Sequence, residues 1–318
     1  MARRGGSGSC WINASLQAVF VPMEFKEVFC EQWRRLHGPL RRQLLEASSL
    51  INRPYGEGAR LPMDCNEQKV LATLFHCLHQ EPNTQQFIPF LHADKHYKGI
   101  QDDASQLLTR ILQTREQVPA IYPLMKGVVV QTLRCLRQEC QHAHFSIEEE
   151  SIALQVSTRS EDGGAVLFTT VQQAIDAYLS LVDRVTLNEK SCPNCGFQCT
   201  EWDKQSKFVE CPRVLMVVLK RWETHDIDGG LLHPVTASQK LQLQEVQYIL
   251  CATVVHLGPT PGSGHYIALA RHRTKDANWW LYDDAHRIIA TEEQVATTCS
   301  YGGMGPMQSY VLFYERAL

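Results

Sequence analysis

The 318-residue sequence contains no uninterrupted apolar run that approaches the length of a membrane-spanning helix, which is about 20 residues. The arginines at positions 3 and 4 are not followed by an apolar segment, so the pattern of a secretory signal is absent as well. These absences argue against a helical membrane protein and a secreted one. We therefore expect a soluble intracellular protein, located in the cytoplasm, the nucleus or both, with no membrane partner.

The sequence also lacks a strong excess of charge of either sign. The formal net charge is -3, so neither nucleic acid nor an anionic membrane is expected as the main partner. Internal repeats and low-complexity linkers are absent too, which argues against a repeat protein or a string of small domains. We expect one elaborate domain over residues 1–318, acting as a monomer.

Cysteine, by contrast, is plentiful, with twelve residues in the chain. In a short secreted protein this number would indicate a disulfide framework. Here the chain is long, has no signal pattern and contains a Cys-x-x-Cys pair at Cys192 and Cys195. A reduced compartment with some metal-bound thiolates fits the sequence better.

The period of the apolar residues changes along the chain. The first third favours helices, as in Leu107, Leu108 and Ile111, whereas segments after Gly127 have the alternation or continuous apolar runs of strands. Helices first and strands later predict an α+β fold rather than a regular parallel α/β sheet. The expected helices are 10–20, 25–50, 70–78, 104–112 and 171–182; the expected strands are 128–134, 152–156, 214–219, 248–257, 265–271, 279–282 and 309–314; a loop is expected at 51–62.

Cys10 stands at the mouth of the first expected helix. Leu16, Val19 and Phe20 form the apolar face of that helix. A thiol at a helix start faces unpaired backbone N–H groups and the positive end of the helix dipole, and both stabilise a thiolate. Taken alone, such a residue is more often a packed free cysteine. Only partner residues elsewhere in the chain can distinguish an activated thiol from a packed free cysteine.

His265 follows the flexible turn 262–264 at the start of an expected strand, and Asp283 and Asp284 end the next strand. If these strands are antiparallel neighbours, a carboxylate reaches the imidazole. A thiolate, a histidine base and an orienting carboxylate are what acyl transfer by a cysteine enzyme requires. The alternatives are a structural histidine and aspartates that cap a turn.

Six ordered motifs resemble those of the ubiquitin-specific protease family. Residues 10–17, Cys-Trp-Ile-Asn-Ala-Ser-Leu-Gln, are similar to its cysteine box, and residues 264–266 with 280–284 are similar to its histidine box. Four intervening or closing segments agree in order, and they are 101–104, 215–222, 254–258 and 309–315. The resemblance covers nearly the whole chain.

This resemblance implies a papain-like hand, with a helical thumb at about 1–125, β fingers at about 126–212 and a β palm at about 213–318. It implies a thiol-dependent isopeptidase that removes ubiquitin or a ubiquitin-like modifier from lysine side chains of proteins. The C-terminal tail of the modifier would run between thumb and palm, and Cys10 would attack its last carbonyl to form a thioester.

The resemblance also implies roles for individual residues. His265 would accept the thiol proton and later protonate the leaving amine, while Asp283 orients the imidazole and Asp284 is the alternative orienting carboxylate. The positions expected to bind substrate are Asp103, Gln106, His256 and Tyr266. Asp103 would pair with arginines of the tail, although its position also suits a helix cap.

One departure concerns the residues before Cys10. The family usually has an asparagine five positions before the cysteine, and this chain has Gly5 there. Loss of one oxyanion donor costs about two to three powers of ten in rate. The backbone N–H of Cys10 or the hydroxyls of Ser7 and Ser9 would compensate in part. The alternative is a truncated or catalytically weak relative that binds ubiquitin as a scaffold.

Two local features resemble an interferon-induced vertebrate branch of the family that acts on a two-domain ubiquitin-like modifier. Gln106 and Leu107 stand where the family usually has Glu-Phe, and segment 17–25 has a similar Val-Phe-Val character. The choice between ubiquitin and this modifier stays open, as do the chain linkage and the target proteins.

The resemblance further implies a structural zinc site in the fingers. Its thiolates would be Cys135, Cys140, Cys192 and Cys195. Four residues separate Cys135 from Cys140, where the family generally has two, and His142, His144 and Cys199 are alternative ligands. The competing reading is a degenerate finger with free thiols. We expect no organic cofactor.

Overall fold

The computed structural model describes residues 10–49, 69, 71–73, 75–76, 103–113, 119–136, 140, 143–160, 166–180, 183–186, 191–196, 201–221, 233–260, 263–271, 278–284, 286–291, 295 and 307–317. The predictions for Gly5, Gly262, His142, Cys199 and the loop 51–62 lie outside these residues. Among the described helices, none has the length and apolar character needed to cross a membrane.

The amino-terminal part of the chain is helical, as expected. It contains α1 (Cys10–Val19), α2 (Met23–Arg35), α3 (Gly38–Ser49), α5 (Ala104–Gln113) and the short α6 (Tyr122–Met125). Residues 69, 71–73 and 75–76 are also helical. The continuous helix expected at 25–50 is wrong, because the chain turns at Leu36 between α2 and α3. The Arg41 side chain donates to the carbonyls of Trp33 at 2.9 Å and Leu36 at 3.1 Å. These hydrogen bonds pair backbone carbonyls at the C-terminal end of α2.

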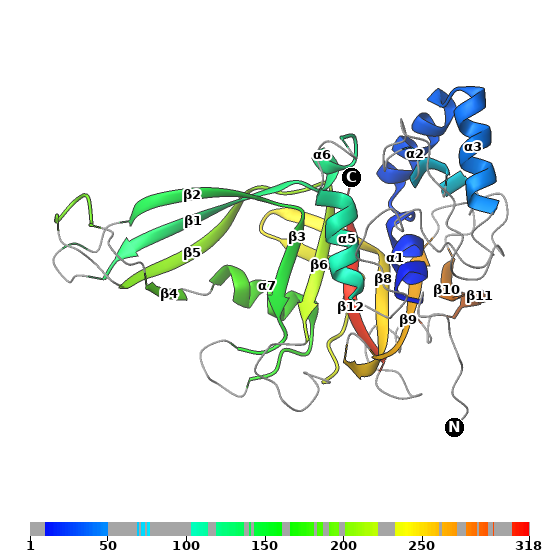
Figure 1. Cartoon of the computed structure of the whole chain (residues 1–318). Coiled ribbons are helices and arrows are strands. Elements are labelled where there is room, and N and C mark those ends of the chain that lie inside the picture. The colour runs from blue at the N-terminus through cyan, green and yellow to red at the C-terminus, as the bar shows by residue number, and fades with distance from the viewer. Residues whose placement is uncertain are drawn as a thin grey trace.

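An eight-stranded sheet forms the body of the molecule (Figure 1). Its strands run in the order β11-β10-β9-β8-β12-β6-β3, with β7 paired to β8, and only the β3–β6 pair is parallel among the described pairs. The bounds are β3 (Ala153–Ser157), β6 (Val214–Lys220), β7 (Lys240–Leu243), β8 (Val246–Thr260), β9 (Ser263–Arg271), β10 (Trp279–Asp283), β11 (His286–Ala290) and β12 (Met307–Arg316). This sheet is the expected palm.

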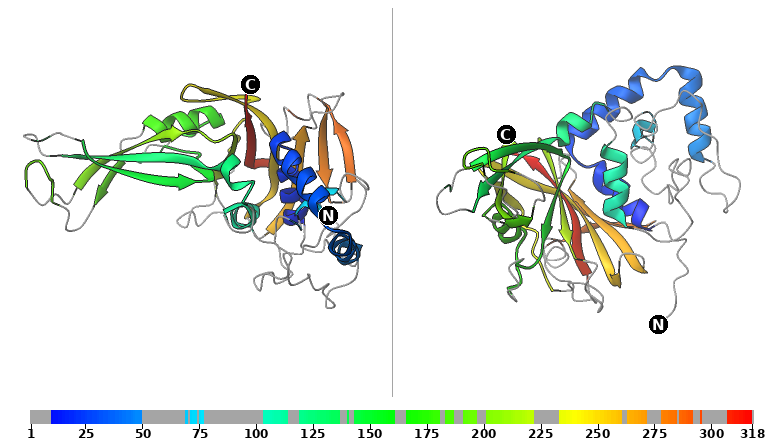
Figure 2. Two further views of the ribbon diagram at one scale, coloured as in Figure 1. Left: turned by 90° about the horizontal axis from the view of Figure 1, so that it is seen from above. Right: turned by 60° about the vertical axis from the view of Figure 1, so that its left-hand side comes forward.

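Helices cover both faces of the palm sheet. In Figure 2 (left), α1 and α5 lie on one side of the sheet and α7 (Val171–Ser180) lies on the other. Leu16 of α1 is buried in one core together with Val254 and Ala268 of the sheet. Ile175 of α7 is buried in a second core, which also contains Leu250 and Leu312. The continuous apolar run of β6 fits a strand that is buried on both faces.

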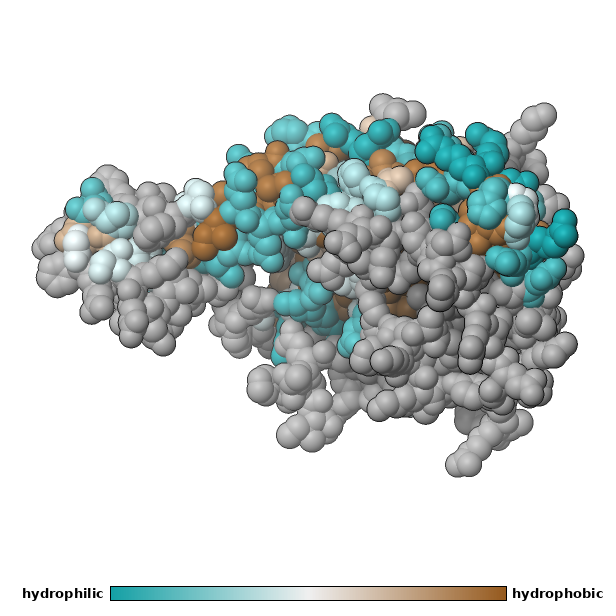
Figure 3. All heavy atoms as spheres, turned by 45° about the horizontal axis from the view of Figure 1, so that its top comes forward, coloured by the Kyte–Doolittle hydropathy of each residue, from teal (hydrophilic) through white to brown (hydrophobic). Residues whose placement is uncertain are grey.

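A second sheet of four strands projects from the body and corresponds to the expected fingers (Figure 1). Its order is β2-β1-β5-β4, with β1 (Gly127–Cys135), β2 (Ala143–Ser151), β4 (Asp183–Thr186) and β5 (Glu201–Glu210). β3 lies inside the range 126–212 that was expected to form the fingers, and it pairs with β6 in the palm sheet. Hydrophobic and hydrophilic side chains alternate over the visible face near the base of this sheet (Figure 3).

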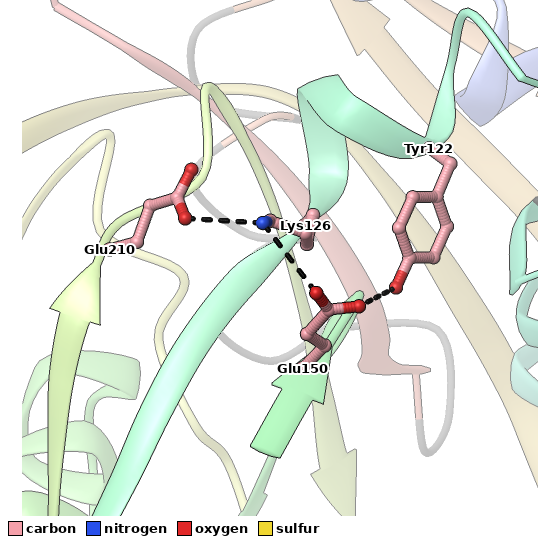
Figure 4. Close-up of polar contacts among 4 residues, drawn as sticks. All are labelled: Tyr122, Lys126, Glu150 and Glu210. Atoms are coloured by element: carbon pink, nitrogen blue, oxygen red, sulfur yellow. Dashed lines mark hydrogen bonds and ion pairs between the residues drawn. The ribbon is translucent and has the colours of Figure 1, made fainter. Parts of the chain in front are cut away.

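A charged cluster joins strands at the base of the fingers (Figure 4). The Lys126 ammonium lies 3.7 Å from a carboxylate oxygen of Glu150 and 3.3 Å from one of Glu210. The Tyr122 hydroxyl donates to the other oxygen of Glu150 at 2.9 Å. Because these groups are partly exposed, the cluster contributes little to stability, and its main consequence is to fix α6 against the ends of β2 and β5.

Candidate functional site

Cys10 is the first residue of α1, and its side chain is buried with 7% of its surface exposed. Helix α1 packs against β8, β9 and β10. This packing brings the thiol to His265 near the start of β9, and the two side chains are joined by a hydrogen bond. The start of α1 and the start of β9 therefore form one site.

Asp283 completes this arrangement from the neighbouring strand β10. Nε2 of His265 lies 2.6 Å from Oδ1 of Asp283, within hydrogen-bond distance. This contact leaves Nδ1 as the ring nitrogen for the Cys10 thiol. The hydrogen bond to the Asp283 carboxylate and then that to Cys10 raise the pKa of the His265 imidazole to about 10, against the opposing effect of burial. An imidazolium beside a thiol favours the thiolate.

The raised pKa of His265 predicts a pH dependence of stability. The pKa is about 10 in the folded chain against 6.5 for a free histidine, so the imidazolium contributes its full stabilisation below about pH 6.5. That contribution is lost as the pH rises from about 6.5 to about 10. In urea unfolding at a series of pH values, we expect the stability difference between the wild type and His265→Ala to shrink over this range. A constant difference would contradict the ion-pair arrangement.

Asp284 has a different partner from Asp283. The Asn13 side-chain nitrogen donates to Oδ1 of Asp284 at 3.0 Å, which ties the first turn of α1 to the turn after β10. The backbone φ of Asp284 is 48°, in the left-handed region that aspartate tolerates better than most residues. Ligand atoms of His265, Asp283 and Asp284 all lie within 4.8 Å of one another. Asn13 was not singled out from the sequence, although it lies in the cysteine box.

Asp103 caps α5, which was the alternative to a substrate-binding role. Its Oδ1 accepts from the Ser105 backbone N–H at 2.7 Å, and the Tyr310 hydroxyl lies 2.8 and 2.7 Å from its two carboxylate oxygens. Asp103 as a whole residue is partly buried. Gln106 is exposed on the same helix. Substrate binding by both residues stays a prediction.

His256 and Tyr266, which were expected to bind substrate, lie inside the palm. Both side chains are fully buried, with 0% of their surface exposed, and their rings pack at 4.5 Å between centroids. They form a directly opposed pair between β8 and β9. Side chains without exposed surface do not present a contact to a modifier tail in this structure. Their position supports the strand that carries His265 instead.

Four cysteines meet in the fingers. Ligand atoms of Cys135, Cys140, Cys192 and Cys195 all lie within 4.8 Å of one another, and the Sγ atoms of Cys140 and Cys192 are 3.5 Å apart. The Gly196 N–H donates to the Cys192 carbonyl at 2.8 Å and closes the tight turn between the last two ligands. The longer spacing between Cys135 and Cys140 therefore does not prevent their convergence.

Comparison with known proteins gives the family of this chain. Residues 6–314 match the family model described as ubiquitin carboxyl-terminal hydrolase. The probable ubiquitin carboxyl-terminal hydrolase creB of Aspergillus niger is 27% identical over 226 residues, which are 67% of this chain and 28% of that protein. The probable ubiquitin carboxyl-terminal hydrolase 9 of Schizosaccharomyces pombe is 23% identical over 62% of this chain and 33% of its own length. The chain thus matches about a third or less of these relatives.

Solved structures confirm the fold. The SAGA DUB module of Ubp8, Sgf11, Sus1 and Sgf73 bound to monoubiquitin matches with a TM-score of 0.65 and 17% identity, covering 99% of this chain and 68% of the matched chain. The same module bound to ubiquitin aldehyde matches with a TM-score of 0.65 and 18% identity, with the same coverage. The expected hand-like α+β fold is confirmed. Because the family model matches nearly the whole length of this chain, the chain belongs to the ubiquitin carboxyl-terminal hydrolase family.

Proposed function

We propose that this chain hydrolyses the isopeptide bond between the C-terminal glycine of ubiquitin and a lysine side chain of a target protein. The observation that carries the proposal is the contact of Cys10 and Asp283 with the same imidazole, His265, in a chain of this family. The solved relatives described as bound to monoubiquitin and ubiquitin aldehyde support ubiquitin as the modifier.

The first half of the reaction uses the Cys10–His265 pair. With its pKa raised to about 10, His265 carries a proton at neutral pH, and the adjacent thiolate attacks the glycine carbonyl. The backbone N–H of Cys10, at the start of α1, would donate to the developing oxyanion. When the tetrahedral intermediate collapses, His265 gives its proton to the lysine amine, the C–N bond breaks and a thioester remains on Cys10.

The second half returns the enzyme to its starting state. His265 is neutral after giving its proton to the amine, and acylation removes the Cys10 charge that helps to raise the pKa of His265, so the ring stays neutral until it takes a proton from the attacking water. Water attacks the thioester, the C–S bond breaks, and ubiquitin leaves with a free carboxylate. Asp283 holds the same ring orientation in both halves through its 2.6 Å contact.

We assign Asp103 and Gln106 to the ubiquitin tail. Asp103 is a partly buried residue whose carboxylate is held in place by Tyr310 and Ser105. A carboxylate fixed by these contacts suits a charge-assisted hydrogen bond from an arginine of the tail. Gln106 is exposed on the same helix and would contact the tail or the adjacent ubiquitin surface.

Hydrolysis of a fluorogenic ubiquitin C-terminal amide tests the proposed activity. We expect turnover by the wild type and none by Cys10→Ala. A two-domain ubiquitin-like substrate assayed in parallel identifies the preferred modifier. Turnover that survives Cys10→Ala, or ubiquitin binding without any turnover by the folded wild type, would contradict the proposal; the second result would support a binding scaffold.

We also infer that the four finger cysteines hold a structural zinc ion. Tetrahedral zinc with bonds of about 2.3 Å to sulfur places its sulfur ligands about 3.8 Å apart, close to the 3.5 Å between Cys140 and Cys192. Cys135, Cys140 and Cys192 are buried, and Trp202 packs beside them without exposed surface. Four thiolates leave no open coordination position, so zinc would stabilise the fingers and take no part in hydrolysis.

Removal of the metal should destabilise the fingers. We expect about one zinc per chain by elemental analysis, and we expect Cys140→Ser to lose zinc and to lower the melting temperature by about 5 °C or more. Cys30→Ser in α2, outside the cluster, is the matched control and should retain the metal. Absence of zinc from the purified wild type, with equal melting of both variants, would show that the thiols are free.

A further inference from the structure

His256 is a fully buried histidine that the proposed reaction does not use. It lies on β8 opposite Tyr266, and the next residue pair, Leu257 with His265, contains the proposed base. His256 points to the same side of β8 as Val254, whose side chain belongs to the core beneath α1. The imidazole of His256 therefore lies inside the palm, next to the segment of β9 that contains His265.

The ring of His256 lies against the backbone of the β8–β9 hairpin. A β-carbon placed on Gly264 would come within 3.0 Å of the His256 Nε2 atom and 2.2 Å of the Leu257 carbonyl oxygen. One placed on Gly258 would come within 3.0 Å of the His256 Cε1 atom. Both glycines have positive φ angles, 125° at Gly264 and 155° at Gly258. The hairpin backbone thus approaches the imidazole as closely as it can only because neither residue has a side chain.

A neutral imidazole suits this place. Burial is the main cause that lowers the pKa of His256 to about 4, and the charge of His265 acts in the same direction. Backbone groups of Ser263 and Gly258 oppose that change. Burying a polar ring costs free energy that an apolar side chain would avoid, and the backbone groups of Ser263 and Gly258 offset part of that cost. The positive charge at the site then stays on His265, which faces Cys10, Asp283 and Asp284.

We propose that His256 is a positioning residue, which seats the Gly258–Gly264 hairpin so that the His265 imidazole meets Cys10. This inference rests on the proposed function of the same site. The His256 ring supports the backbone of Gly264. That backbone determines where the side chain of the next residue, His265, projects. Small displacements of a reacting group are costly, with losses of about 100-fold for about 1 Å.

The test measures the Cys10–His265 pair directly, without any modifier. The rate at which iodoacetamide alkylates Cys10 is followed by peptide mass spectrometry from acidic to alkaline pH. His256→Leu and His256→Phe remove the ring nitrogens while filling most of the space, and His256→Gln keeps polar atoms. Val254→Ala truncates the same face of β8 and controls for general destabilisation. Hydrolysis of the ubiquitin amide is measured on the same samples.

We expect His256→Leu and His256→Phe to alkylate Cys10 about 10-fold more slowly at neutral pH, with a profile displaced toward that of His265→Ala. His256→Gln should be intermediate, and Val254→Ala should melt earlier but keep the wild-type profile. If the leucine variant does not fold, the phenylalanine variant decides. Wild-type alkylation profiles in the folded variants would overturn the inference, even if ubiquitin hydrolysis is confirmed. A wild type that does not hydrolyse ubiquitin overturns the proposed function instead, because alkylation needs no modifier.

Discussion

Replacing His265 with alanine should lower kcat/KM for the ubiquitin amide by about 10⁴-fold or more. The imidazolium is the group that stabilises the Cys10 thiolate and the proton donor to the leaving amine, and one substitution removes both. Alkylation of Cys10 at neutral pH should slow as well, since the positive charge beside the thiolate is lost. Single-turnover kinetics at saturating substrate separate this loss of rate from any change in substrate binding.

The matched control for that substitution is His37→Ala. His37 is an exposed histidine at the start of α3, remote from the palm in sequence and in fold. Its replacement should leave kcat/KM within about 2-fold of the wild type, as is usual for surface changes away from a site. Equal activity of His265→Ala and His37→Ala would contradict the assignment of His265.

Replacing Asp283 with asparagine should lower kcat/KM by about 10³- to 10⁴-fold, the loss typical when the orienting carboxylate of such a triad is neutralised. The hydrogen bond from His265 to Asp283 is the largest of the causes that raise the imidazole pKa. Without the negative charge that pKa falls, so the alkaline limb of the pH–rate profile should move to lower pH. The profile of kcat/KM against pH for the free enzyme checks this directly.

Asp284→Asn distinguishes the two adjacent carboxylates. An asparagine oxygen at position 284 still accepts from the Asn13 side chain, which now contacts Asp284 at 3.0 Å. We therefore expect a loss of only about 10-fold and an alkaline limb close to that of the wild type. If Asp284→Asn proves the more damaging change, Asp284 and not Asp283 supports the chemistry, and the 2.6 Å contact in this structure does not identify the functional partner.

The palm could be predicted well because its strands are rich in apolar residues. The run Val214–Leu219 and the alternation around Leu154 are present as β6 and β3, and the helical stripe of Leu107, Leu108 and Ile111 is present in α5. These elements bury their apolar faces against one another, so period and burial coincide.

The fingers were harder to predict because their strands are polar. β2 contains the run Glu148–Glu150, and β5 alternates charged residues with Trp202, Ser206 and Phe208. A projecting sheet has little core of its own, so its pairing depends on partners distant in the chain, such as Cys135 opposite Trp202. The alternation of apolar residues along the sequence therefore indicates these strands only weakly.

The site itself was predictable in composition and less so in detail. Cys10, His265 and Asp283 could be named from residue types and motif resemblance, and the structure brings them together. The Asn13–Asp284 link joins residues 271 positions apart and has no local signal. The burial of His256 was also invisible, because a polar residue in a motif indicates a substrate contact until the fold shows which face it occupies.

Reaction with a ubiquitin that carries an electrophile in place of its C-terminal carboxylate tests the central claim most directly. The probe must be recognised by its tail, delivered between thumb and palm, and attacked by an activated thiolate. We predict one covalent adduct per chain, mapped by mass spectrometry to Cys10, and none with Cys10→Ala. A folded wild type that forms no adduct, or an adduct mapped to a cysteine other than Cys10, would contradict the account.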